Sequence, residues 1–113
     1  MSGALDATAR TDDASIMQTF GESASPTRKA NDLPRLAREF PADRLALLPY
    51  FYLDCGLKDP WLASNRDFSS VLLERKIVHE YRQLPGNHVW AYWDRQVREV
   101  IRIAAKRMVT AER

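Results

Sequence analysis

A short run of large apolar residues, Tyr50–Leu53, is the feature that most constrains the fold of this chain. Pro49 and Gly56 bound the run, which gives it the length of a strand rather than of a helix. A strand that is apolar on both faces is typical of the interior of a parallel sheet, where helices cover both sides. The sequence therefore predicts an α/β fold that has this strand at its centre.

The residues after this strand predict a helix, a second strand and a second helix. The first helix is expected from Pro60 to about Arg75, and the second strand spans Val78–Leu84, where many polar residues indicate the edge of a sheet. The closing helix, about Ala91–Arg107, is amphipathic. Its apolar face carries Val97, Val100, Ile101, Ala104 and Met108, and its basic face carries Arg95, Arg98, Arg102 and Lys106. Strand, helix, strand and helix in this order form a right-handed crossover unit of parallel strands flanked by helices.

The first 47 residues predict only short helices and loops. Asp12 or Asp13 is expected to cap a helix over Ala14–Phe20, residues 22–31 to form an irregular loop, and a second short helix to follow and end at Pro41. We expect one domain over residues 1–113, with a lead-in over 1–47 and the strand–helix–strand–helix unit over 48–113. Because two strands do not close a doubly wound sheet, this unit is typical of part of a larger α/β fold.

Two titratable residues follow the ends of the two predicted strands. Asp59 lies just after the first strand, and His88 lies in the turn Pro85–His88 after the second. The carboxyl ends of adjacent parallel strands meet at one edge of a sheet, so we expect the two side chains to be neighbours. Asp59 could simply cap the following helix, and His88 could be a solvated loop residue. The alternative is an acid that orients a catalytic imidazole, and for Asp59 both roles are compatible.

Three segments, 54–60, 73–81 and 85–93, together resemble the esterase family of α/β hydrolases that includes S-formylglutathione hydrolase, feruloyl esterases and mycolyltransferases. The resemblance covers about residues 48–105 and implies the C-terminal part of an α/β-hydrolase fold. It implies that Asp59 is the triad acid and His88 the base of a serine carboxylic-ester hydrolase. Met1–Gly3 would then end the strand that follows the nucleophile helix. The family's pattern has glycine at Asn87, which tolerates the same turn, and an acid at Val89.

The nucleophile of this fold, a serine in a Gly-x-Ser-x-Gly turn, does not occur in the sequence. Ser23 comes nearest, but Ser25 stands where the turn needs glycine. We therefore expect the chain to supply the Asp and His of a triad and to be inactive alone. A small-molecule ester would be its substrate if a nucleophile-bearing segment completed it, and the unpaired sheet edge predicts association with another copy or with an N-terminal half. The alternative is a non-catalytic remnant that acts as a binding or structural module through that edge.

Other functional classes find little support in the sequence. A net charge of +2 does not point to nucleic acid, and neither a signal peptide nor a membrane span is visible, so a cytoplasmic protein is expected. Two histidines and one cysteine offer no metal-ligand spacing, and no cofactor is expected.

Cys55 is expected in the core, and His79 is expected to be solvated or hydrogen-bonded. The basic helix face is expected to be solvated rather than to bind an anionic partner, and Trp90, Tyr92 and Trp93 to pack around His88.

Overall fold

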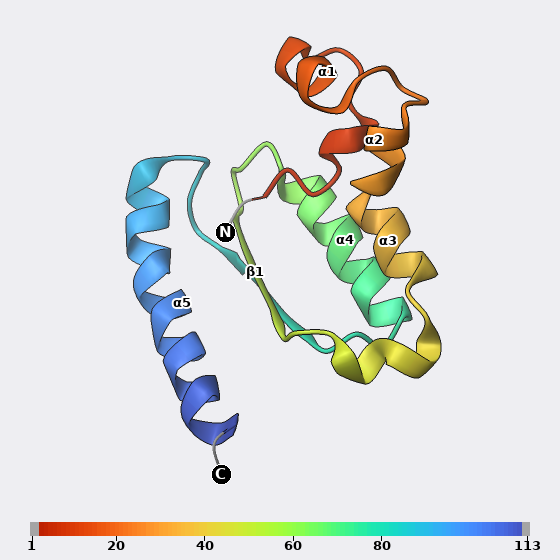
Figure 1. Ribbon diagram of the computed structural model, residues 1–113. Helices are drawn as coiled ribbons and strands as arrows, with labels where there is room; N and C mark the ends of the chain where they lie inside the picture. The colour runs from red at the N-terminus through yellow and green to blue at the C-terminus, as the bar shows by residue number, and fades with distance from the viewer. Residues whose placement is uncertain (1–2, 112–113) are drawn as a thin grey trace.

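A computed structural model describes residues 3–111 of the chain and contains two strands flanked by helices (Figure 1). Met1 and Ser2, which were predicted to end a strand, lie outside the described residues, and Gly3 is not in a strand. No helix within residues 3–111 combines the length and the hydropathy needed to cross a bilayer. In chain order the elements are η1 (Ala7–Ala9), α1 (Ala14–Phe20), α2 (Pro26–Ala30), α3 (Leu33–Glu39), η2 (Ala42–Leu47), β1 (Phe51–Gly56), α4 (Leu62–Glu74), β2 (His79–Leu84) and α5 (Trp90–Ala111).

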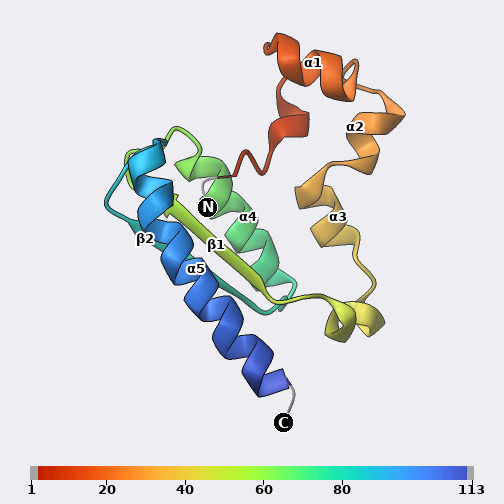
Figure 2. The same ribbon diagram turned by 60° about the vertical axis from the view of Figure 1, so that its left-hand side comes forward.

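The two strands pair in parallel, with Phe51 opposite His79 and Gly56 opposite Leu84. Figures 1 and 2 show α4 on one side of the sheet and α5 on the other, as the predicted crossover unit requires. Four consecutive residues of β1, Leu53–Gly56, are buried, whereas no residue of β2 is. The prediction that the first strand is the more enclosed of the two is confirmed. The arrangement is that of a partial α/β fold with two strands among the described residues.

The hydrophobic core lies between the sheet and α4. Leu53 of β1, Phe68 and Leu72 of α4, and Ile77 before β2 form its buried centre. Residues of η2 and α3 cover its outer side. The residues predicted to face the core from α4 are buried at Phe68, Val71 and Leu72, while Leu62 is only half-buried. The helical period of the apolar residues therefore identified the correct face of this helix.

Helix α5 contacts the sheet through a different side from the one its apolar residues suggest. Tyr92 and Gln96 are its buried residues among those whose burial is described. The apolar residues that share a face, as predicted, include Val97, Ile101 and Met108, which are 37%, 62% and 70% exposed. The strand residues that face α5 include the polar Asp54 and Arg82. They form hydrogen bonds with Tyr92 and Glu99 of the helix rather than contacts with its apolar residues. Val100, at the edge of this face, is half-buried beside Tyr52 of β1, while Val97, Ile101 and Met108 remain exposed among the described residues.

The lead-in confirms two predicted helices and corrects one predicted loop. The Asp13 carboxylate accepts hydrogen bonds from the Ser15 and Ile16 amides at the start of α1, and Gly21 ends that helix with a φ of 76°. Asp32 caps α3 in the same way. The expectation of an irregular loop over 22–31 is wrong for Pro26–Ala30, which forms α2. The Ser25 hydroxyl accepts from the Arg28 amide, and proline at the first position suits a helix start.

Arg28 connects the separate pieces of the lead-in. Arg28 is 3% exposed, and its guanidinium donates to the carbonyl oxygens of Thr8, Arg10 and Gly21 at 2.6–2.7 Å. A buried guanidinium is tolerated when its donors are satisfied, and only arginine offers several donors in a rigid fork. One side chain therefore joins η1, the end of α1 and α2.

Replacement of Arg28 by lysine keeps the charge but removes most of these donors. We expect Arg28→Lys to lower the free energy of unfolding by about 2–4 kcal/mol, because carbonyl groups are left without partners around a buried cation. Urea denaturation followed by circular dichroism measures the change. The matched control is Arg38→Lys on the exposed side of α3, which should cost less than about 0.5 kcal/mol. Equal effects of the two substitutions would contradict the proposed role.

Candidate active site

Two glycines bring the ends of the two strands together. A Cβ atom on Gly56 would lie 2.6 Å from the carbonyl oxygen of Gly86, so nothing larger fits at the end of β1 without a shift. Beyond the strands, the Leu57 amide donates to Leu84 O and the Lys58 amide donates to Gly86 O, both at 2.9 Å. Gly86 has a φ of 153°, and a Cβ there would meet the ring of Tyr92. The loops after β1 and β2 are therefore held in direct contact.

This contact brings together the two residues that the sequence singled out. His88 Nδ1 lies 3.0 Å from Asp59 Oδ2. The Asp59 side chain is fully buried, while that of His88 is 36% exposed. The other carboxylate oxygen, Oδ1, accepts a hydrogen bond from the Trp61 amide at 2.8 Å, just before α4. Asp59 thus holds the turn before α4 and contacts the imidazole, so the predicted proximity is observed, and the catalytic roles of the two residues stay a prediction. Asp59 does not cap the helix as expected, because α4 starts at Leu62, two residues later than predicted, with Trp61 at its N-cap.

The hydrogen bond determines which ring nitrogen of His88 is basic. A carboxylate can only accept, so Nδ1 donates its proton to Asp59 and Nε2 carries the lone pair. The edge of Trp93 packs on the imidazole, with centroids 4.8 Å apart and ring planes at 88°. Asn87 Oδ1 accepts from the His88 amide at 2.9 Å. The imidazole is held by a carboxylate, an aromatic ring and its own turn.

Tyr92 anchors the start of α5 beneath this site. Tyr92 is 1% exposed, and its hydroxyl donates to Asp54 Oδ1 of β1 at 2.9 Å. Burial, followed by the hydrogen bond to Asp54, raises the pKa of Tyr92 well above its usual range, so the hydroxyl keeps its proton. The expectation that aromatic residues pack around His88 holds for Tyr92 and Trp93. Trp90 is 82% exposed and packs on Trp93, with ring centroids 5.1 Å apart, rather than on His88 itself.

A serine–histidine contact elsewhere in the fold was not predicted from the sequence. The Ser69 hydroxyl lies 3.0 Å from His79 Nε2, and His79 Nδ1 lies 2.9 Å from the carbonyl oxygen of Ile77. The carbonyl can only accept, so Nδ1 is the donor and Nε2 accepts the Ser69 proton. Ser69 is 4% exposed, which leaves a substrate no access to its oxygen. This pair ties α4 to the start of β2, and His79 is hydrogen-bonded, as one of the two expectations for it states.

The other residues considered from the sequence lie away from the site or are enclosed. Ser23 is in the exposed turn between α1 and α2, and Figures 1 and 2 show this segment apart from the loop between β2 and α5. Cys55 is fully buried in β1. No hydrogen bond to His88 Nε2 is found from any donor in residues 3–111. In the same part of the chain, no three His, Cys, Asp or Glu side chains gather as metal ligands would.

The structure is similar to that of a ferulic acid esterase. The two chains are 28% identical, with a TM-score of 0.57, over 63% of this chain and 29% of that chain. The fold is esterase-like. No family model matches the chain, and no curated protein does. The chain spans less than a third of the length of the esterase it resembles.

Because the approach of Gly56 to Gly86 positions both Asp59 and His88, a single methyl group should disturb the site. We expect Gly56→Ala to push the two loops apart, weaken the Asp59–His88 hydrogen bond and cost about 1–3 kcal/mol of stability, as overpacking usually does. Denaturation measures the stability, and ¹⁵N NMR of the His88 ring reports which nitrogen carries the proton. Leu57→Ala, at the exposed next residue, should leave the ring signals unchanged. Unaltered His88 signals in Gly56→Ala would show that the glycine contact does not position the imidazole.

Proposed function

We propose that this chain supplies the acid and the base of a serine carboxylic-ester hydrolase. The observation that carries the proposal is the 3.0 Å hydrogen bond between buried Asp59 and half-exposed His88. Both residues follow the carboxyl ends of parallel strands, where open α/β folds bind and convert their ligands. The likeness to a ferulic acid esterase supports an esterase-like function.

In the completed enzyme, His88 Nε2 would remove the proton from a serine hydroxyl as the oxygen attacks the ester carbonyl. Asp59 holds the ring through Nδ1 and stabilises the imidazolium that forms. The imidazolium then gives its proton to the leaving alcohol, which yields an acyl-serine. Water, deprotonated by His88, then attacks the acyl carbon; the bond to the serine oxygen breaks, His88 returns the proton to that oxygen, and the carboxylic acid leaves with the serine regenerated.

The nucleophile and the donors that bind the oxyanion would come from outside this sequence, because it contains no Gly-x-Ser-x-Gly turn. The surface that would receive them lies on the side of β1 that faces away from β2. There β1 has no partner strand among residues 3–111, and an apolar groove of about 280 Å³ opens beside α5. Tyr50, Tyr52, Val100, Ile103, Ala104, Arg107 and Met108 line it. A free strand edge next to apolar side chains favours pairing with another copy or with an N-terminal half.

A second candidate is a non-catalytic module derived from the same fold. It is favoured by the lack of any nucleophile bonded to His88 among residues 3–111. In that case the free edge of β1 would bind a partner strand, and the Asp59–His88 pair would only join the two loops. The two candidates differ in whether the removal of His88 changes any chemical reaction.

Hydrolysis of 4-nitrophenyl acetate separates the two candidates. The purified chain alone should hydrolyse the ester no faster than its His88→Ala and Ser23→Ala variants, since an imidazole without a serine lacks the covalent step. A companion polypeptide that carries the Gly-x-Ser-x-Gly turn and the missing strands should restore turnover, first of this ester and then of a ferulic acid ester. In the completed enzyme, Asp59→Asn should lower kcat by a factor on the order of 10⁴.

Restored hydrolysis that is the same with His88→Ala would show that His88 is not the base and would favour the non-catalytic module. Turnover by the chain alone that both His88→Ala and Ser23→Ala abolish would instead assign the nucleophile to Ser23.

The free edge also predicts self-association of the purified chain. Multi-angle light scattering should give a mass that rises with protein concentration, and Ile101→Lys should suppress the rise, because a charge would be buried in an apolar contact. Ile101 is 62% exposed on the apolar face of α5. Val109→Lys is the matched control, since Val109 is similarly exposed but lies outside that face. A monomer at all concentrations would contradict self-association.

A further inference from the structure

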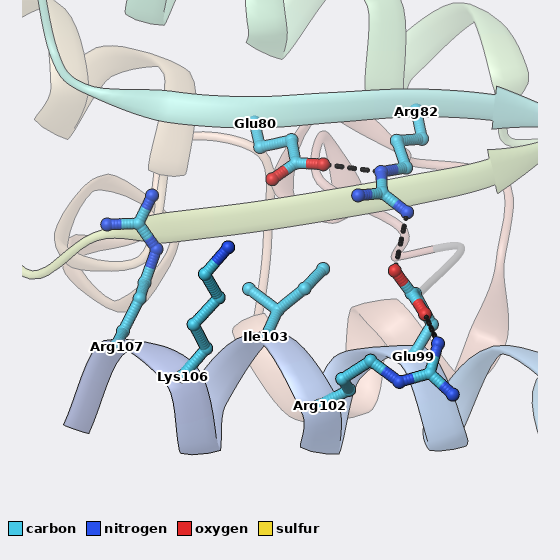
Figure 3. A pocket seen from close by; sticks show the side chains of 7 residues that line it. All are labelled: Glu80, Arg82, Glu99, Arg102, Ile103, Lys106 and Arg107. Atoms are coloured by element: carbon cyan, nitrogen blue, oxygen red, sulfur yellow. Dashed lines mark hydrogen bonds and ion pairs between the residues drawn. The ribbon is translucent and has the colours of Figure 1, made fainter. Parts of the chain in front are cut away.

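A second groove, lined mainly by charged side chains, runs between the sheet and α5 on the opposite flank. It encloses about 450 Å³ between β2 and the second half of α5 (Figure 3). Its lining consists of Glu80, Arg82, Glu99, Arg102, Ile103, Lys106 and Arg107. The lining contains four cationic side chains and two carboxylates. Residues 99, 102, 103 and 106 share one face of the helix, and Figure 3 shows Lys106 and Arg107 reaching from α5 toward the strands.

The two carboxylates of the groove hold guanidinium groups in place. Glu99 accepts from Arg82 at 3.0 Å through one oxygen and from Arg102 at 2.7 Å through the other. Glu80 is bonded to Arg82 and accepts from the Tyr50 hydroxyl at 3.0 Å. All four carboxylate oxygens are thus engaged. The hydrogen bonds to Glu99 and Glu80 also raise the pKa of Arg82, which keeps it charged.

Arg107 is fixed by an aromatic ring. Its guanidinium carbon lies 3.1 Å from the centroid of the Tyr50 ring, in the position of a stacked cation. The Tyr50 hydroxyl also donates to Glu80. Tyr50 therefore links Arg107 to the hydrogen-bonded residues Glu80, Arg82, Glu99 and Arg102. Three guanidinium groups, from β2 and from two turns of α5, are therefore oriented before any ligand arrives. Such preorganisation lowers the entropy cost of binding an anion.

The two flanks of α5 differ in chemistry. The groove beside β1 is lined mostly by tyrosine and aliphatic side chains, which suits contact with further protein. The groove beside β2 is lined mainly by charged side chains, which disfavours burial against apolar protein surface, because desolvation of charged groups is costly. This groove also lies toward the amino ends of the strands, since Glu80 is the second residue of β2, whereas Asp59 and His88 lie beyond the carboxyl ends.

We propose that the groove formed by Arg82, Arg102, Lys106 and Arg107 binds the phosphoryl group of a small molecule. The cations approach the groove from β2 on one side and from two turns of α5 on the other, which suits an anion whose charge is spread over several oxygens in three dimensions. A planar carboxylate would be satisfied by one guanidinium fork. The site is separate from the Asp59–His88 pair and does not rest on the proposed hydrolase function.

Isothermal titration calorimetry with sodium pyrophosphate at constant ionic strength tests the proposal on the full chain. We expect saturable binding by the unaltered chain, and a rise in Kd of about tenfold for each of Arg102→Gln and Lys106→Gln, the usual effect of losing one charged hydrogen bond. Arg98→Gln is the matched control. Arg98 is on the same helix, pairs with Asp94 and does not line the groove, so this variant should change Kd by less than about twofold. Circular dichroism establishes that the three variants fold, which is expected for side chains as exposed as Arg98 and Arg102.

Three results would overturn the proposal. No saturable binding by about 10 mM pyrophosphate would mean that the groove has no useful affinity for phosphoryl groups. An equal loss of affinity in Arg98→Gln and in the groove variants would show that only the general charge of the helix attracts the anion. Tighter binding of citrate than of pyrophosphate, at the same ionic strength, would show that the groove selects carboxylates instead.

Discussion

The close contact between Gly56 and Gly86 is the constraint on which the candidate active site depends. It allows the Lys58 amide to bond to Gly86 O, and this bond fixes the loop after β1 against the loop after β2. Only then do a carboxylate and an imidazole that are 29 residues apart in the chain meet at 3.0 Å. A side chain at either glycine would cause a steric clash: at Gly56 with the backbone of Gly86, and at Gly86 with the ring of Tyr92. The geometry of the pair is therefore set by backbone packing, and the two side chains only complete it.

The position of α5 follows from polar contacts at an otherwise ordinary helix–sheet interface. The Tyr92 hydroxyl meets Asp54 near the carboxyl end of β1, Glu99 meets Arg82 in the middle of the interface, and Arg107 stacks on Tyr50 near the amino end. Directional contacts at three levels fix both the rotation and the translation of the helix, whereas an apolar interface would permit sliding. His88 lies just before this helix, so the contacts that orient α5 also limit the motion of the imidazole.

The sequence predicted the elements of this fold better than their contacts. The apolar run at Tyr50–Leu53 and the positions of Asp59 and His88 after the strands were enough to predict a parallel pair with the two residues side by side, because backbone geometry alone brings them there. Contacts that need a particular rotamer were not predictable. Nothing in the spacing of Ser69 and His79, or of Arg28 and its three carbonyl partners, indicates that these groups meet. Helix α2 was missed because five residues show no periodicity, although Ser25 and Pro26 mark its start.

The amphipathic pattern of α5 identified an apolar face correctly, but most of that face stays exposed, and only its edge at Val100 is half-buried beside β1. A pattern of apolar residues records which surface is buried in the complete assembly, and it does not tell which neighbour buries it. Tyr92, Glu99 and Arg107 of α5 contact Asp54, Arg82 and Tyr50, while Val97, Ile101 and Met108 remain open. We expect an apolar partner for those three residues and a partner strand for the unpaired edge of β1, next to the groove that Met108 lines. A strand that pairs with β1, followed or preceded by a helix beside α5, meets both requirements at once. The carboxyl ends of the added strands would then lie in line with those of β1 and β2, which the Asp59–His88 pair follows, and a nucleophile would have to lie at that end of the sheet.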